Sequence, residues 1–149
     1  MKALPNRFIF QEAENILHQG GTVKLRLIGN SMFPLLHSDI DTVVIVPVSK
    51  KKLQRGTVVL FRYGKQYILH RIINKQNNIF QICGDGICIQ KETATSENII
   101  GILDRIEHTN GQITYCCSWN WRIKSEIWML LRPMRRYLLG IYRRIKKDN

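Results

Sequence analysis

The stretch "TVVLFRYGKQYILHRII" (57–73) indicates the fold class of this chain. It contains two runs rich in β-branched and aromatic residues, 57–63 and 66–73, separated by a glycine and a lysine. Runs of this composition are typical of β-strands, and their spacing suits antiparallel strands. Alternation along the second run places His70 on one face together with two isoleucines. The stretch therefore predicts part of an antiparallel sheet in which one strand carries a histidine.

Similar short runs lie on both sides of this stretch and are separated by clusters of Gly, Asn, Lys and Pro. They cover residues 22–29, 41–48, 78–84, 98–108 and 112–117. Ahead of them, Pro5 to His18 has apolar residues at helical spacing and is followed by two glycines, which predicts one amphipathic helix. We therefore expect a mainly β protein with a partly rolled antiparallel sheet and an N-terminal helix.

The pattern changes at Trp119, where apolar residues are interspersed with arginines at helical spacing. Pro133 interrupts this segment, so two short helices are the simplest interpretation. The predicted organisation is a β domain with its N-terminal helix over residues 1–118 and a basic, aromatic-rich amphipathic helical tail over 119–149. No repeat or low-complexity linker divides the chain.

Charge is concentrated in the tail. The chain of 149 residues has a net charge of +12, and residues 122–149 contain nine of its 23 Lys and Arg but two of its 11 Asp and Glu. Such a tail can be attracted to nucleic acid, an anionic membrane surface or an acidic partner. Its tryptophans and tyrosines suit lipid headgroups, which favours peripheral contact with an anionic membrane. The alternative is that its apolar stripe packs on the sheet while the arginines are solvated. Nucleic-acid binding is not expected, because no recognised nucleic-acid module accompanies the charge.

The sequence contains neither a secretory signal pattern nor a run of about 18 apolar residues. We therefore expect a cytoplasmic protein, with the tail available for contact at the inner membrane face. Its four cysteines, Cys83, Cys88, Cys116 and Cys117, lack the spacing of a zinc site. We expect no metal, no disulfide framework and no cofactor.

A candidate nucleophile lies in "GNSMFPLLHSDI" (29–40). Ser31 follows an apolar run, and Gly29 permits a tight turn beside it. On this stretch alone, Ser31 is equally a nucleophile or an ordinary polar turn residue. His70 is the side chain best suited to accept a hydroxyl proton near neutral pH.

The order of "GNSMFPLLHSDI", "RGTVVLFRY", "YILHRII", "CGDG" and "ENIIGIL" resembles the signal peptidase and LexA-type serine peptidase superfamily. The resemblance covers about residues 25–103 and implies a mostly β catalytic core. Bacterial signal peptidases and LexA-type members use a lysine base, whereas the ER-type signal peptidases have histidine at that place. The resemblance therefore implies an ER-type Ser-His dyad.

By this resemblance, Ser31 is the nucleophile, His70 is the general base, and Asp85 is the best candidate to orient the imidazole. Glu92 and Glu97 remain alternatives for that third position. The Ser31 backbone N–H, with the Asn30 side chain, would form the oxyanion hole beside Gly29. The other histidines, His18, His37 and His108, are expected to be structural, and Asp39 and Asp41 to stabilise a turn and the start of a strand.

The predicted function is a serine endopeptidase that cleaves an extended peptide or leader segment by a Ser/His dyad mechanism. A substrate of this kind adds to the edge of a sheet. The alternative is a non-catalytic peptide-binding or regulatory domain that has kept the peptidase fold. Close approach of the Ser31 and His70 side chains favours the enzyme.

Overall fold

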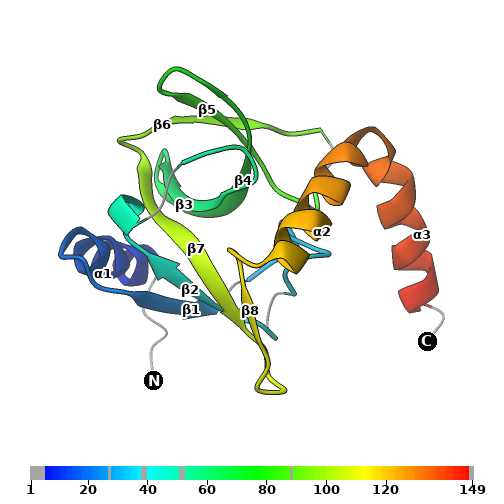
Figure 1. Cartoon of the computed structure of the whole chain (residues 1–149), viewed down its shortest axis with the longest axis horizontal. Coiled ribbons are helices and arrows are strands. Elements are labelled where there is room, and N and C mark those ends of the chain that lie inside the picture. The colour runs from blue at the N-terminus through cyan, green and yellow to red at the C-terminus, as the bar shows by residue number, and fades with distance from the viewer. Residues whose placement is uncertain (1–5, 27, 38–39, 51–52, 88, 148–149) are drawn as a thin grey trace.

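The computed structural model describes residues 6–26, 28–37, 40–50, 53–87 and 89–147 (Figure 1). These form one antiparallel sheet of eight strands with three α-helices and two 3-10 turns. The strand order is β1-β2-β7-β3-β4-β5-β6, and β8 pairs with β7 beside this path. The strands are β1 (Val23–Arg26), β2 (Thr42–Val46), β3 (Val58–Tyr63), β4 (Gln66–Gln76), β5 (Ile79–Cys83), β6 (Glu92–Thr95), β7 (Ile99–Glu107) and β8 (Ile113–Tyr115).

The β3–β4 hairpin is the element that the opening stretch predicts. Val59 lies opposite His70, and Tyr63 lies opposite Gln66 across a two-residue turn. Gly64 in this turn has a φ of 59°, a conformation that favours glycine. The hairpin curls strongly (Figure 1), and register shifts interrupt the ladders of β3 with β7 and of β4 with β5. Such register shifts bend a strand, so the single sheet can curve around both apolar clusters of the core.

Two apolar clusters form the core. One contains Leu17 of the N-terminal helix and Trp121 near the C-terminus, and the other centres on Phe61 and Phe80. Strands β2, β3 and β7 have consecutive buried residues rather than an alternating pattern. These central strands are therefore covered on both faces.

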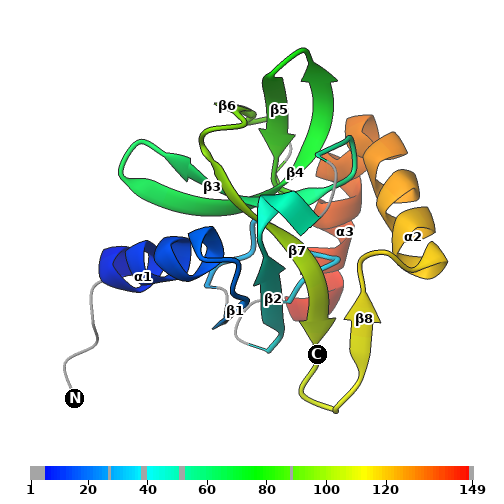
Figure 2. The same ribbon diagram turned by 60° about the vertical axis from the view of Figure 1, so that its left-hand side comes forward.

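Helices lie on opposite sides of the sheet (Figure 2). The N-terminal helix α1 (Asn6–His18) buries Ala13 and Leu17 against the sheet. On the other side lie α2 (Trp119–Leu130) and α3 (Arg135–Lys147), which are separated by a 3-10 turn over Arg132–Met134. A second 3-10 turn, Val48–Lys50, follows β2. None of the helices in the described residues has the length and apolar character needed to cross a membrane.

The predicted mainly β antiparallel sheet, its N-terminal helix and the interrupted C-terminal helices are confirmed. The sheet is open, since β1 and β6 at its two ends are not paired with each other in the described part of the chain. Strand β6 is an addition that the sequence patterns did not indicate. Its segment "ETAT" is short and polar, and burial alternates along it.

Candidate active site

The Ser31 turn comes shortly after β1 in the chain and covers residues 29–36. Gly29 has a φ of 91°, so the tight turn expected here needs a residue without a Cβ. The turn is closed by backbone hydrogen bonds from Phe33 N–H to the Asn30 carbonyl, 3.2 Å, and from Leu36 N–H to the Met32 carbonyl, 3.1 Å. Ser31 is half-buried within it. The local sequence therefore builds a rigid turn with the serine near its start.

Two glycines of the "CGDG" turn bring the Ser31 turn next to His70. The Gly86 N–H donates a hydrogen bond of 2.8 Å to the Ser31 carbonyl oxygen. A Cβ placed on Gly84 would overlap that same carbonyl oxygen and lie 3.0 Å from His70 Nε2. The Ser31 backbone and His70 Nε2 therefore flank one glycine, and only a glycine leaves room for both. Within the described residues, no hydrogen bond joins the Ser31 hydroxyl directly to His70.

His70 is held by Glu92. Its Nδ1 lies 3.0 Å from Glu92 Oε2, and both side chains are about 4% exposed. A buried carboxylate at this nitrogen favours the tautomer in which Nδ1 carries the proton. Nε2, the nitrogen that faces Gly84, is then free of its proton and able to accept one.

Asp85 does not contact His70, which corrects the expectation that it orients the imidazole. Its carboxylate is instead engaged by Arg71, with Nε and Nη2 donating to Oδ1 and Oδ2 at 2.9 and 2.7 Å. Both side chains are buried, and a bidentate arginine satisfies the oxygens that an imidazole would need. The alternative Glu97 is exposed in the β6–β7 turn, so Glu92 is the one carboxylate of the three placed at His70.

Arg71 connects the sheet, the "CGDG" turn and α2. Besides Asp85, its Nη1 donates to the Gly56 carbonyl at 2.8 Å and to Ser125 Oγ at 2.9 Å. Its guanidinium also lies over the Trp121 ring, 5.4 Å from the centroid. The sequence patterns do not indicate this role of Arg71, because its partners lie 14, 15 and 54 residues away along the chain. A fully buried arginine next to a buried aspartate is a structural network rather than a site for chemistry.

A groove of about 560 Å³ opens beside Ser31. It is bounded by β1, α1 and β4, and most of its lining is apolar, including Leu25, Ile28 and Leu69. Tyr67 forms part of its wall and donates a 2.8 Å hydrogen bond to Glu14. Burial, followed by this hydrogen bond, raises the pKa of the Tyr67 hydroxyl. The Tyr67 hydroxyl therefore stays protonated at physiological pH.

The β1 strand leaves one edge open along this groove. In the described residues β1 pairs with β2 alone, and Lys24, Leu25 and Arg26 of β1 line the groove. An edge strand presents unpaired backbone N–H and C=O groups. A peptide that adds to this edge would extend toward Ser31, which lines the same groove.

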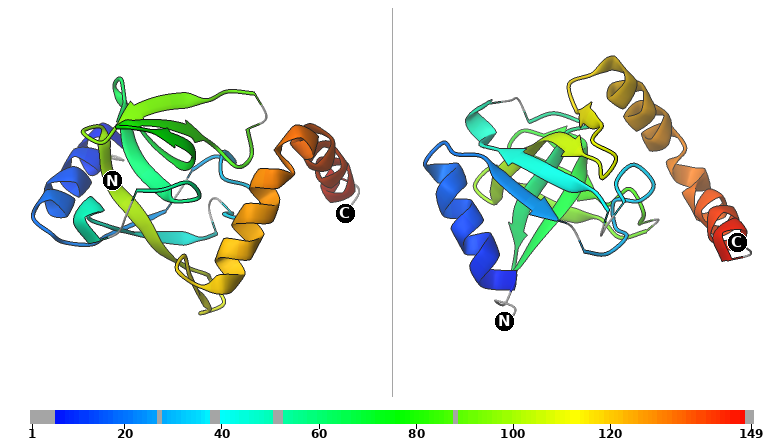
Figure 3. Two further views of the ribbon diagram at one scale, coloured as in Figure 1. Left: turned by 45° about the horizontal axis from the view of Figure 1, so that its top comes forward. Right: turned by 90° about the horizontal axis from the view of Figure 1, so that it is seen from below.

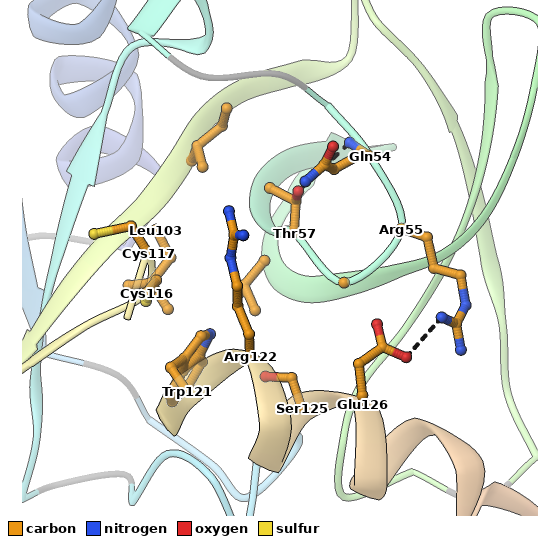
Figure 4. Close-up of a pocket in the computed structure, with 13 residues that line it drawn as sticks. Gln54, Arg55, Thr57, Leu103, Cys116, Cys117, Trp121, Arg122, Ser125 and Glu126 are labelled. Atoms are coloured by element: carbon orange, nitrogen blue, oxygen red, sulfur yellow. Dashed lines mark hydrogen bonds and ion pairs between the residues drawn. The ribbon is translucent and has the colours of Figure 1, made fainter. Parts of the chain in front are cut away.

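A second cavity, of about 630 Å³, lies between α2 and the start of β3. Cys116, Cys117, Trp121 and Arg122 line it, and an ion pair of 2.8 Å between Arg55 and Glu126 lies among its lining residues (Figure 4). Neither Ser31 nor His70 is among its lining residues. This larger cavity is therefore separate from the candidate active site.

The remaining histidines lie outside the site, as expected. His18 is exposed and 3.6 Å from Glu14, whereas His37 and His108 both approach Asp41. His108 Nδ1 lies 2.7 Å from Asp41 Oδ1, and the His37 backbone N–H donates 2.9 Å to Oδ2. Asp41 thus stabilises the turn that leads into β2. Asp39 lies outside the described residues.

Of the described cysteines, Cys83 and Cys117 are free thiols, while Cys88 lies outside the described residues. Burial raises the pKa of the Cys83 thiol, which keeps it protonated and unreactive. No group of three His, Cys, Asp or Glu side chains suited to a metal is present among the residues that the structure describes.

Comparisons with known proteins leave the family open. No protein-family model matches the chain, and no curated protein is significantly similar to it in sequence.

Proposed function

We propose that this chain is a serine endopeptidase of the signal peptidase/LexA type, in which Ser31, His70 and Glu92 act together. The observation that carries the proposal is the position of His70. Nδ1 is hydrogen-bonded to a buried carboxylate, and Nε2 faces the glycine against which the Ser31 turn packs. This is the order of nucleophile, base and orienting acid that acyl transfer by serine requires.

In the proposed reaction, the Ser31 hydroxyl comes within about 3 Å of His70 Nε2 and transfers its proton there as Oγ attacks the scissile carbonyl carbon. Glu92 stabilises the imidazolium that forms. The imidazolium then donates its proton to the leaving amine as the peptide bond breaks. Water, activated by the same histidine, hydrolyses the acyl-serine and releases the second product.

The substrate fits as an extended segment along β1. The groove beside Ser31 is apolar over most of its lining and has the open edge of β1 along it. Backbone hydrogen bonds to that edge would hold many sequences, and apolar side chains at alternate positions would enter the groove. We propose a leader or precursor peptide with apolar residues at the positions that enter the groove.

The decisive experiment measures labelling of the purified chain by a fluorophosphonate probe. Wild type is expected to incorporate one probe, and Ser31→Ala is expected to incorporate none. Ser49→Ala is the matched control, because Ser49 is exposed in the 3-10 turn after β2 and distant in sequence from the site. Labelling that is equal in wild type and Ser31→Ala would exclude Ser31 as the nucleophile.

A second candidate function is a non-catalytic peptide-binding domain that uses the same groove. The observation that favours it is the missing direct hydrogen bond between the Ser31 hydroxyl and His70 among the described residues. This candidate predicts that wild type binds extended peptides but is not labelled by the probe.

A further inference from the structure

The α2 helix has an uncovered apolar face. Trp119, Ile123, Ile127 and Leu130 recur at intervals of three or four residues, and each is more than half exposed. The opposite face of α2 buries Trp121, Ser125 and Met129 against the rest of the chain. Four large apolar side chains along the outer face of one helix form a stripe that an ordinary solvated helix does not have.

The next helix continues this feature. Met134 of the 3-10 turn and Tyr137, Ile141 and Ile145 of α3 are each more than half exposed, while Leu139 is buried on the inner side. Figure 3 shows α2 and α3 on the same side of the molecule, outside the sheet. Exposed apolar residues therefore extend along both helices. We call them the outer apolar face, which consists of Trp119, Ile123, Ile127, Leu130, Met134, Tyr137, Ile141 and Ile145.

The charge of α3 favours an anionic partner. All six charged residues within Arg135–Lys147 are basic. Of these, Arg135 is buried and the others are exposed beside the apolar residues. A helix with an exposed apolar face, a tyrosine on that face and a uniformly basic remainder suits the headgroup region of an anionic bilayer. An acid-free helix would repel a second copy of itself, so self-association of this face is disfavoured.

We propose that the outer apolar face of α2 and α3 docks on an anionic lipid surface. The apolar side chains would enter the headgroup boundary, and the arginines and lysines of α3 would contact lipid phosphates. The inner sides of the same helices contact the "CGDG" turn and the Ser31 turn. Trp128 Nε1 donates a 2.9 Å hydrogen bond to the Asp85 carbonyl oxygen. The ring centroids of Tyr142 and Phe33 lie 4.7 Å apart. Docking would therefore hold the Ser31 turn near the membrane surface. The proposal does not depend on catalysis.

Co-sedimentation with vesicles tests the proposal. The full chain is mixed with vesicles of phosphatidylcholine alone or of phosphatidylcholine with phosphatidylglycerol, at low and at physiological salt. Wild type is expected to bind the anionic vesicles about tenfold more tightly than the neutral ones, with weaker binding at higher salt. Ile141→Asp combined with Ile145→Asp is expected to lower binding to anionic vesicles about tenfold or more.

Ile79→Asp is the matched control, because Ile79 is a comparably exposed isoleucine on β5 outside these helices. It is expected to bind like wild type. Circular dichroism verifies the fold of each variant. Ile123→Asp on α2 is the second variant, and it is also expected to weaken binding. It provides the test if the α3 variant fails to fold. Equal binding to neutral and anionic vesicles, or no loss in a folded variant, would overturn the proposal. The proposal would also be overturned if wild type formed dimers that do not bind vesicles and that dissociate on substitution at Ile141. This face would then be a contact between two copies of the chain.

Discussion

At the scale of single residues, two buried carboxylates near the candidate active site have different partners. Glu92 bonds to His70, whereas Asp85 bonds to Arg71. The first contact orients an imidazole, and the second neutralises the charge of a guanidinium. We therefore expect substitutions of the two carboxylates to have separable effects on activity and on stability.

Glu92→Gln is expected to lower the rate of probe labelling or peptide cleavage by about 100-fold or more, because the amide no longer stabilises the charged imidazole. The rate is measured from the time course at saturating probe. Glu97→Gln serves as the control, since Glu97 is exposed. Equal rates for Glu92→Gln and wild type would remove Glu92 from the proposed mechanism.

Asp85→Asn is expected to lower the free energy of unfolding by about 3 to 5 kcal/mol, because it leaves the buried Arg71 charge unneutralised. Urea titration gives this quantity. Glu126→Gln is the matched control, as its pair with Arg55 is about half exposed and is expected to contribute about 1 kcal/mol or less. If Asp85→Asn kept its stability and lost probe labelling, Asp85 rather than Glu92 would be the chemically active acid.

At the scale of elements, the "CGDG" turn is the part that joins the Ser31 turn to the sheet. It follows β5, and its two glycines let the backbone of the Ser31 turn approach. A side chain at Gly84 would meet a carbonyl oxygen of that turn, and backbone atoms yield less easily than flexible side chains. The turn therefore couples the packing of the sheet to the geometry of the nucleophile.

Gly84→Ala is expected to reduce stability by about 1 to 3 kcal/mol and to abolish probe labelling in the molecules that still fold. Gly140→Ala is the contrasting change. Within α3 its added methyl meets nothing within 4 Å, so it is expected to stabilise the chain by about 0.5 to 1 kcal/mol. Thermal unfolding and labelling are measured on both variants. A Gly84→Ala variant with wild-type labelling would show that the Ser31 turn does not depend on this contact.

At the scale of the whole molecule, the C-terminal helices are part of the folded unit. Trp121 belongs to the larger core cluster, Ser125 bonds to Arg71, and Arg135 Nη1 donates a 3.5 Å hydrogen bond to the Gly84 carbonyl. The inner face of the tail thus packs on the β domain, whereas its outer face is exposed. The buried inner face fits the alternative in which the tail packs on the sheet, whereas membrane contact by the outer face stays a proposal.

Because all three tryptophans lie in α2, fluorescence reports this helix, whereas far-UV circular dichroism reports the whole fold. The two signals are expected to give coincident urea transitions, since α2 shares its core with the sheet. A fluorescence transition at clearly lower urea would indicate instead that the tail unfolds independently of the sheet.

Elements that depend on local patterns can be predicted from the sequence. The alternation within 57–73, the break at its glycine and the helical spacing after Trp119 identified nearly all the strands and helices, because their residues alternate or recur along one segment. Ser31 and His70 were identified as candidates from their local settings and from the order of motifs.

Which carboxylate contacts His70 depends on long-range packing and cannot be predicted from local sequence. Glu92 lies opposite Ile82 on β5, and Ile82 lies opposite Ile72 on β4, so the carboxylate reaches His70 across an intervening strand. That contact depends on the register of two ladders and on a four-residue strand too short and polar to be recognised from its sequence. Asp85 lies closer to His70 in the sequence than Glu92 does, and it was the expected partner of the imidazole. Its carboxylate binds Arg71 instead, because long-range packing rather than sequence proximity determines which buried charges meet.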